Sequence, residues 1–215
     1  MLGLPEPDPS VLARRGEIAK ALTAIVPDGV IGDDATLTAY DRDALTAYHQ
    51  KPLLCVLPRT ADQVSSILKY ASRENIRIVP RGAGTSLSGG SLPLADSILL
   101  GLSRMNKILE IDYENRCAVV QPGITNASVT RAVQGAGFYY APDPSSQIAC
   151  SIGGNVAENS GGIHCLKYGL TTQNLLGVEI VLMNGERVRL GGKHAGEGGL
   201  DLDRKSTRLN SSHRT

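Results

Sequence analysis

Tryptophan is absent from this sequence, and phenylalanine occurs only once in 215 residues. Neither sign of charge dominates, because 22 Lys and Arg residues stand against 21 Asp and Glu residues. Surfaces that bind nucleic acid need basic side chains for the phosphates and aromatic rings for the bases. The composition therefore excludes nucleic acid as an expected partner.

Long hydrophobic runs are also lacking. No apolar stretch approaches the ~20 residues that a membrane-spanning helix requires. The first nine residues do not show a basic segment followed by an apolar one, as a secretory signal would. We expect a cytoplasmic protein with no direct membrane insertion.

Cysteine is scarce and scattered. Cys55, Cys117, Cys150 and Cys165 form no Cys-x-x-Cys pair, which argues against zinc or iron–sulfur ligation within the chain. We predict no metal ligands here, and reduced thiols are the simplest interpretation of the four cysteines.

Glycine, in contrast, is concentrated in two stretches, of which the first is Pro80–Gly90, directly after an apolar segment. Glycines permit positive φ angles and close backbone approach, so successive N–H groups can converge on an anion, and hydroxyls and one arginine add donors. A flexible surface loop is the alternative, and Arg81 could instead pair with an acidic neighbour. A nicotinamide dinucleotide fold is disfavoured, because Gly82-Ala83-Gly84 lacks a third glycine at the required spacing. The candidate phosphate ligands are Arg81, Gly82, Ala83, Gly84, Thr85, Ser86, Ser88 and Gly89.

The second stretch, Pro142–Gly162, contains two glycine pairs that frame two asparagines. Small residues allow a backbone to lie against a flat ligand, and amide side chains can read ring heteroatoms. A tightly folded turn with no ligand is the alternative. The candidate ligand contacts are Pro144, Ser145, Ser146, Cys150, Ser151, Gly153, Gly154, Asn155, Asn159 and Gly162.

These two stretches, with the following segment His164–Leu170, resemble the FAD-binding domain of the vanillyl-alcohol-oxidase superfamily. More narrowly, the chain is similar to flavoproteins of the glycolate-oxidase and D-lactate-dehydrogenase type, over roughly Asp33 to Leu202. The resemblance implies that the first stretch binds the FAD pyrophosphate. It also implies that the second stretch contacts the ring system, the ribityl chain and the adenosine part.

The resemblance further implies an oxidoreductase that transfers hydride from a small 2-hydroxy acid to FAD, with glycolate as the first substrate and D-lactate as the second. It implies a separate iron–sulfur subunit as electron acceptor, and partners that recruit the protein to the inner face of the membrane. Some related flavoproteins bond FAD covalently through a histidine in the first loop. Thr85 occupies that kind of position here, so we expect non-covalent FAD.

The catalytic base, the substrate anchors and any metal ligands are, by the resemblance, expected in a substrate domain downstream of Leu202, so the chain alone should have little activity. A non-catalytic FAD-binding module, or a truncated remnant, is the alternative from another functional class. His164 has a pKa near 6.5 that suits proton transfer. Since the sequence shows no partner for it, we interpret it as structural.

The pattern of elements predicts an α+β fold, with an early β-α-β unit and a mainly antiparallel second part. Strands over Leu53–Leu57 and Ile76–Val79 flank a helix that begins at a Thr60/Gln63 capping box. Asn184-Gly185 is a strong signal for a hairpin turn. The other expected elements are helices over Ser10–Ile25 and Asn126–Gln134, strands over Ser97–Gly101, Ile108–Ile111 and Cys117–Gln121, and hairpin strands over Val178–Met183 and Glu186–Leu190.

Three segments are expected along the chain. Residues 1–50 form a helical lead-in, and residues 51–202 form a FAD-binding domain that is incomplete at its C-terminal end. Residues 203–215 form a basic tail with one apolar residue. The tail resembles the translation of a sequencing-adapter oligonucleotide, so we hypothesise that it is non-native and that the natural gene continues past Leu202.

Overall fold

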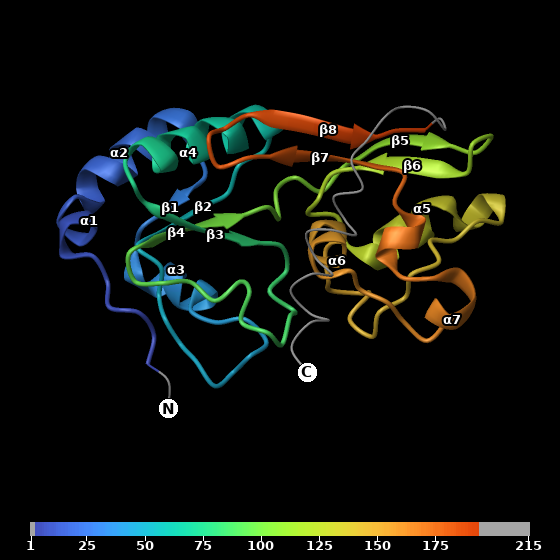
Figure 1. The fold of residues 1–215 in the computed structure, drawn as a ribbon, viewed down its shortest axis with the longest axis horizontal. Coiled ribbons are helices and arrows are strands. Elements are labelled where there is room, and N and C mark those ends of the chain that lie inside the picture. The colour runs from blue at the N-terminus through green and yellow to red at the C-terminus, as the bar shows by residue number, and fades with distance from the viewer. Residues whose placement is uncertain (1–2, 194–215) are drawn as a thin grey trace. The chain divides into compact units, whose positions relative to one another are not determined.

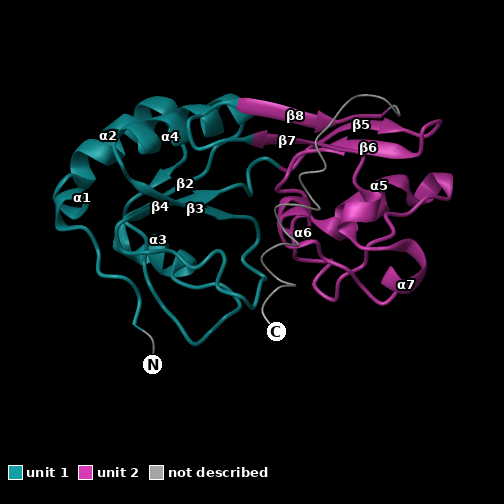
Figure 2. Cartoon of the chain, viewed as in Figure 1, with its two compact units in different colours: residues 1–105, 181–186 teal, residues 106–180, 187–215 magenta. Residues whose placement is uncertain are grey.

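The computed structural model describes residues 3–193, so the predicted tail 203–215 lies outside the described residues. The chain forms two compact units (Figure 2). Unit 1 contains the described residues up to Met105 together with Val181–Glu186. Unit 2 contains Asn106–Ile180 and the described residues from Arg187 onward. Each unit carries one of the two glycine-rich stretches.

Unit 1 is built on a four-stranded sheet (Figure 1). In spatial order its strands are β1 (Val30–Ile31), β2 (Leu54–Val56), β4 (Ser97–Gly101) and β3 (Arg77–Arg81). The last three run parallel, and β1 is antiparallel to β2. The predicted parallel arrangement of the strands around the first long helix is confirmed, but β4 lies between β2 and β3.

The two central strands, β2 and β4, are buried at every position because both faces of the sheet are covered. On one face, Leu54, Val56 and Ile98 belong to the main core, which includes residues from the N-terminal helices and the long helix. On the other face, Cys55 and Leu99 pack with Leu37 in a second core cluster. Alternate side chains of one strand thus serve two cores.

Three helices of unit 1 start at side-chain caps. Asp8 caps α1 (Pro9–Ala13), Asp33 caps α3 (Asp34–Leu37) and Thr60 caps α4 (Ala61–Arg73). Half of the predicted capping box is present, since the Thr60 hydroxyl accepts from Gln63 N–H at 3.2 Å. The Gln63 side chain, however, accepts from the N–H of Arg59 and not from the N–H of Thr60. The other helices are α2 (Arg15–Ile25) and the 3₁₀ turn η1 (Thr38–Tyr40).

The prediction of one N-terminal helix over Ser10–Ile25 is wrong. The chain forms α1 and α2, which are separated at Arg14. The Arg14 side chain bonds to Glu17 and, at 2.6 Å, to Glu74 at the end of α4. This residue leaves the helical ladder while its side chain ties α2 to α4.

Unit 2 has two antiparallel pairs of strands and short helices. The predicted strands over Ile108–Ile111 and Cys117–Gln121 are confirmed as the antiparallel pair β5 (Ile108–Asp112) and β6 (Cys117–Val120). Ile124, Val129 and Ile152 form its core cluster. The remaining elements are α5 (Asn126–Val133), η2 (Gln134–Ala136), α6 (Ile152–Glu158), α7 (Cys165–Tyr168), η3 (Thr171–Asn174), β7 (Gly177–Val181) and β8 (Arg187–Gly191).

The predicted Asn184-Gly185 turn is confirmed between β7 and β8. Its tip belongs to unit 1, where Ser65 of α4 donates to the Gly185 carbonyl and Val181 packs against the main core. Gly185 has a φ of 83°, and an added Cβ would lie 2.7 Å from the Ser65 carbonyl oxygen. Only glycine therefore satisfies both the turn and the close packing.

The mixed α+β architecture confirms the predicted fold class. Among the described residues, no helix is long and apolar enough to cross a membrane.

Truncating the central strand tests the core. Ile98 of β4 is fully buried, so Ile98→Ala should cost about 2–5 kcal/mol of stability through lost burial and a residual cavity. Leu12→Ala, at a partly exposed position of α1, is the matched control and should change stability by less than about 0.5 kcal/mol. Urea denaturation followed by circular dichroism measures both, and equal effects would contradict the assigned core.

Candidate functional site

The loop that follows β3 in unit 1 presents a row of free backbone donors. Among residues 3–193, the N–H groups of Gly82 to Leu87 have no hydrogen-bond acceptor. Gly84 and Gly89 have φ angles of 71° and 75°, which turn the backbone in a way that side-chain-bearing residues rarely allow. Successive N–H groups left free in a glycine-rich turn can serve as a binding site for an anion.

The predicted ligands of this loop differ in what their side chains do. The Ser86 hydroxyl accepts from Ser88 N–H at 3.2 Å, so it helps to shape the loop. The guanidinium of Arg81 donates to the Arg42 carbonyl at 2.6 Å and is in no ion pair among the described residues. Thus the loop's backbone supplies a row of free donors, whereas one N–H of the Arg81 guanidinium is already bonded inside the unit.

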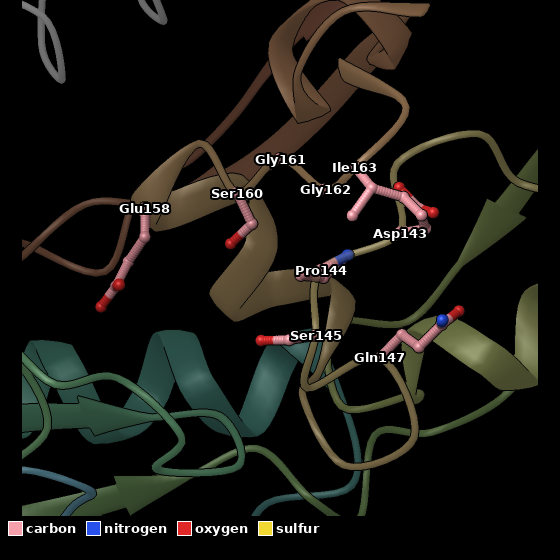
Figure 3. Close-up of a pocket in the computed structure, with 9 residues that line it drawn as sticks. All are labelled: Asp143, Pro144, Ser145, Gln147, Glu158, Ser160, Gly161, Gly162 and Ile163. Carbon is pink, nitrogen blue, oxygen red and sulfur yellow. The ribbon is translucent and has the colours of Figure 1, made fainter. Parts of the chain in front are cut away.

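The second glycine-rich stretch surrounds a cavity of about 690 Å³ in unit 2 (Figure 3). Figure 3 shows Asp143 and Gln147 on one side of it and Glu158 and Ser160 on the other. Of the ten residues predicted from this stretch, Pro144, Ser145 and Gly162 line the cavity. Its lining is Asp143, Pro144, Ser145, Gln147, Glu158, Ser160, Gly161, Gly162 and Ile163.

The charge of this cavity limits what it can hold. Asp143 and Glu158 both line it, and no Lys or Arg side chain does. Carboxylates repel a phosphate and accept hydrogen bonds from neutral donors such as sugar hydroxyls. The cavity therefore suits uncharged polar groups such as sugar hydroxyls. The donor row of unit 1, taken by itself, suits an anion.

The glycines of the second stretch have reasons to be glycine inside the chain itself. Gly153 donates its N–H to the Pro122 carbonyl at 2.8 Å, and an added Cβ would lie 2.7 Å from Pro122 Cβ. An added Cβ at Gly162 would overlap the Asp143 backbone carbonyl and carboxylate. The absence of a Cβ at Gly153 and Gly162 thus allows the chain to pack tightly against itself, independently of any ligand.

Several other predicted residues are held inside the unit. Ser151 caps α6 by accepting from Gly154 N–H at 3.3 Å, and Asn159 ends the helix with a φ of 51° and accepts from Thr172 N–H at 3.0 Å. Cys150 and Asn155 are buried. Within the described chain, Asn155 Nδ2 and Asn126 Oδ1 lack partners, and both atoms are buried away from the surface. One is a donor and the other an acceptor, and each would need a partner such as an internal water.

His164 has a partner that the sequence did not reveal. Its Nδ1 lies 2.6 Å from Asp143 Oδ2, and its N–H donates to Asp143 Oδ1 at 3.4 Å. Partial burial alone would raise the pKa of Asp143, but the hydrogen bonds and charge of His164 hold that pKa below its usual range. The expectation that His164 lacks a partner is therefore wrong, and its structural role stays a prediction, with the contacts to Asp143 tying His164 to the start of the second stretch.

A tyrosine pair lies beside this histidine. The rings of Tyr139 and Tyr168 meet edge to face at 6.0 Å, and Lys167 Nζ lies 4.8 Å from the centre of the Tyr168 ring. Hydrogen bonds from Tyr139 and Lys167 lower the pKa of Tyr168. The α7 segment thus presents a polarised phenol next to His164, whose ring centre is 6.4 Å from that of Tyr168.

Six cavity-lining residues were not among the predicted ones: Asp143, Gln147, Glu158, Ser160, Gly161 and Ile163. All but Ile163 fall within the second stretch, and Ile163 follows it directly. Reading that stretch as one continuous ligand-facing segment would have found most of them. Choosing only its small residues and asparagines favoured positions that the structure uses for packing.

Known protein sequences include a family and several relatives that are similar to this chain. The family described as "FAD binding domain" matches residues 52–191. The glycolate oxidase subunit GlcD of Escherichia coli K12 is 49% identical over 189 residues, which cover 87% of this chain and 38% of that protein. GlcD of Bacillus subtilis is 44% identical over 179 residues, covering 83% of this chain and 38% of that protein. A D-2-hydroxyglutarate dehydrogenase of Stutzerimonas stutzeri is 32% identical over 168 residues, covering 78% of this chain and 36% of that protein.

Solved structures share the fold. An alkyldihydroxyacetonephosphate synthase superimposes with a TM-score of 0.76 at 22% identity, over 95% of this chain and 38% of its own. A p-cresol methylhydroxylase superimposes with a TM-score of 0.73 at 23% identity, over 86% of this chain and 36% of its own. At these identities the likeness concerns the fold alone.

The packing of Gly162 against Asp143 gives a test of the cavity wall. Gly162→Ala forces a Cβ into the Asp143 backbone, which should cost about 1–3 kcal/mol and lower the melting temperature by roughly 2–4 °C per kcal/mol. Gly135→Ala is the control, since an added Cβ there meets no atom within 4 Å. Differential scanning calorimetry measures both variants. A Gly162→Ala variant as stable as the control would contradict the described wall.

Proposed function

The chain belongs to the FAD binding domain family, and from that premise we propose that it is the flavin-binding part of an oxidoreductase that oxidises a small 2-hydroxy acid. Glycolate is the first proposed substrate. D-lactate is the second, and other D-2-hydroxy acids follow.

The observation that carries this proposal is the row of free N–H donors from Gly82 to Leu87. A loop whose successive backbone N–H groups make no hydrogen bonds within the chain fits a ligand with several clustered acceptors. The pyrophosphate of FAD is such a ligand, and the glycines at 84 and 89 give the backbone the turns it needs to approach it. The residues present therefore fit the cofactor that the family implies. They would hold it mainly by their backbone.

The cavity of unit 2 fits the uncharged parts of the same cofactor. We assign to it the ribityl chain, the ring system or the adenosine part, with contacts from Ser145, Ser160 and the backbone of Gly161 and Gly162. Within the described chain, the N–H groups of Gly161 and Gly162 lack acceptors and can serve as donors. When bound, FAD supplies the hydride-accepting chemistry, and the residues of this chain orient it.

The activity of the whole protein is inferred from longer relatives. The chain covers 38% of the length of the GlcD proteins it matches. We propose that the catalytic base and the substrate anchors lie outside residues 1–202, and that a separate iron–sulfur subunit accepts the electrons. Partners of this kind would bring the protein to the inner face of the membrane.

The choice of glycolate rests on relatives of graded similarity. The GlcD proteins are 49% and 44% identical to this chain, and the D-2-hydroxyglutarate dehydrogenase is 32% identical. The names of all three point to 2-hydroxy acids or to glycolate itself. The chemical class is therefore common to them, and the size of the acid distinguishes them.

The spectrum of the full-length protein tests the proposal. Purified from its complete reading frame, the protein should show flavin absorption bands that bleach anaerobically on addition of glycolate, and more slowly with D-lactate or D-2-hydroxyglutarate. The 215-residue chain alone is the control and should not turn over glycolate. A colourless full-length protein, or bands that none of these acids bleaches, would overturn the function.

The mode of FAD attachment is tested by acid precipitation. Thr85 lacks the nucleophilic nitrogen that a covalent flavin bond requires in this loop. The yellow colour should therefore stay in the supernatant when the protein is precipitated with trichloroacetic acid. Colour that remains in the washed pellet would count against non-covalent binding.

A further inference from the structure

A short segment between β1 and β2, Tyr40–Leu45, contacts the glycine loop of unit 1 at several points. Ala44 donates its N–H to the Gly84 carbonyl at 3.0 Å. An added Cβ at Gly89 would lie 3.2 Å from the Leu45 side chain. We call this segment the brace, because it contacts the loop near both of its ends.

Arg81 joins the brace to the loop. Its guanidinium donates to the Arg42 carbonyl at 2.6 Å and lies over the Tyr40 ring, with Cζ 6.0 Å from the ring centre. An added Cβ at Gly84 would lie 2.7 Å from the same Cζ. The planar group thus fills the space between the brace and the turn at Gly84.

Asp43 supplies a second tie and the opposite charge. Its carboxylate is almost completely buried, at 4% exposure, and accepts from Leu45 N–H at 2.9 Å. Ser91, at the far end of the loop, donates to its other oxygen at 3.5 Å. Burial lowers the pKa of Arg81, whereas the Asp43 charge acts in the opposite direction and favours the charged guanidinium.

We propose that Arg81 and Asp43 are positioning residues, which hold the free N–H groups of Gly82 to Leu87 in the shape that binds a pyrophosphate. This inference rests on the proposed function of the loop. Neither side chain contacts the ligand in this arrangement. Each acts through the brace, so that the loop loses less conformational entropy when the ligand binds.

A direct phosphate contact by Arg81 is the competing role, and lysine separates the two. Lysine keeps the positive charge but has no planar group to lie between Tyr40, Gly84 and the Arg42 carbonyl. If Arg81 acts as a charge on the phosphate, Arg81→Lys should bind FAD nearly as well as the wild type. If it acts by shape, Arg81→Lys should lose affinity as Arg81→Gln does.

The experiment measures FAD binding to the full-length apoprotein by fluorescence quenching, for the wild type and for Arg81→Lys, Arg81→Gln and Asp43→Asn. Arg73→Gln is the matched control, since Arg73 is an exposed arginine of the same unit that pairs with Glu74. We expect both Arg81 variants to raise the Kd for FAD about tenfold, the effect of one charge-assisted hydrogen bond. We expect Asp43→Asn to raise it severalfold and the control to leave it unchanged.

A second readout separates positioning from general damage. At saturating FAD, the kcat and the flavin spectrum of the Arg81 variants should match those of the wild type, because the bound loop regains its shape. Wild-type affinity in Arg81→Lys, or a fall in kcat that saturating FAD does not restore, would overturn the inference. Should the Arg81 variants fail to fold, Asp43→Asn decides, and wild-type affinity in that variant would overturn it.

Failure of the proposed function gives a different result. A wild-type apoprotein that binds no FAD removes the premise itself. A wild-type protein that binds FAD alongside an Arg81→Lys variant of equal affinity removes only the positioning role.

Discussion

Free backbone donors after β3 constrain the rest of unit 1. Six successive N–H groups of partly exposed residues have no acceptor in the described chain and are left for water or a ligand. The loop stays partly open and has few hydrogen bonds of its own, one of them from Ser88 N–H to the Ser86 hydroxyl. Much of its shape therefore comes from what surrounds it: the parallel strands β3 and β4 that lead into and away from it, and the brace at Tyr40–Leu45.

The two glycine-rich stretches look alike in sequence, but glycine has a different role in each. In unit 1 the positive φ angles of Gly84 and Gly89 keep a loop open. In unit 2 Gly153 and Gly162 let chain segments close on one another, against Pro122 and Asp143. Composition alone does not distinguish these uses, because both depend on the absence of a Cβ. Only the neighbours of each glycine decide which applies.

The sequence predicted what depends on local chemistry. The apolar runs of β2 and β4, the cap at Thr60 and the turn at Asn184-Gly185 follow from neighbouring residues, and the structure contains each of them.

The sequence did not predict what depends on distant contacts. Arg14, at the break between α1 and α2, bonds to Glu74, and the ring of His164 bonds to Asp143, twenty-one residues earlier. The segment that includes Arg42 and Asp43 suggested no chemistry by itself, because its role exists only where the loop folds beside it.

The contact between the hairpin tip and α4 determines when unit 1 can be completed during synthesis. Unit 1 is not complete when Met105 has left the ribosome, because its last piece, Val181–Glu186, is made only after most of unit 2. Until then the face of α4 at Ser65, and the part of the core that Val181 covers, stay open to water or to chaperones. The two units are therefore compact in space, but the ribosome does not complete one before it starts the other. Cutting the gene between them would leave the first without its final contact and the second with an apolar residue that has no place to bury.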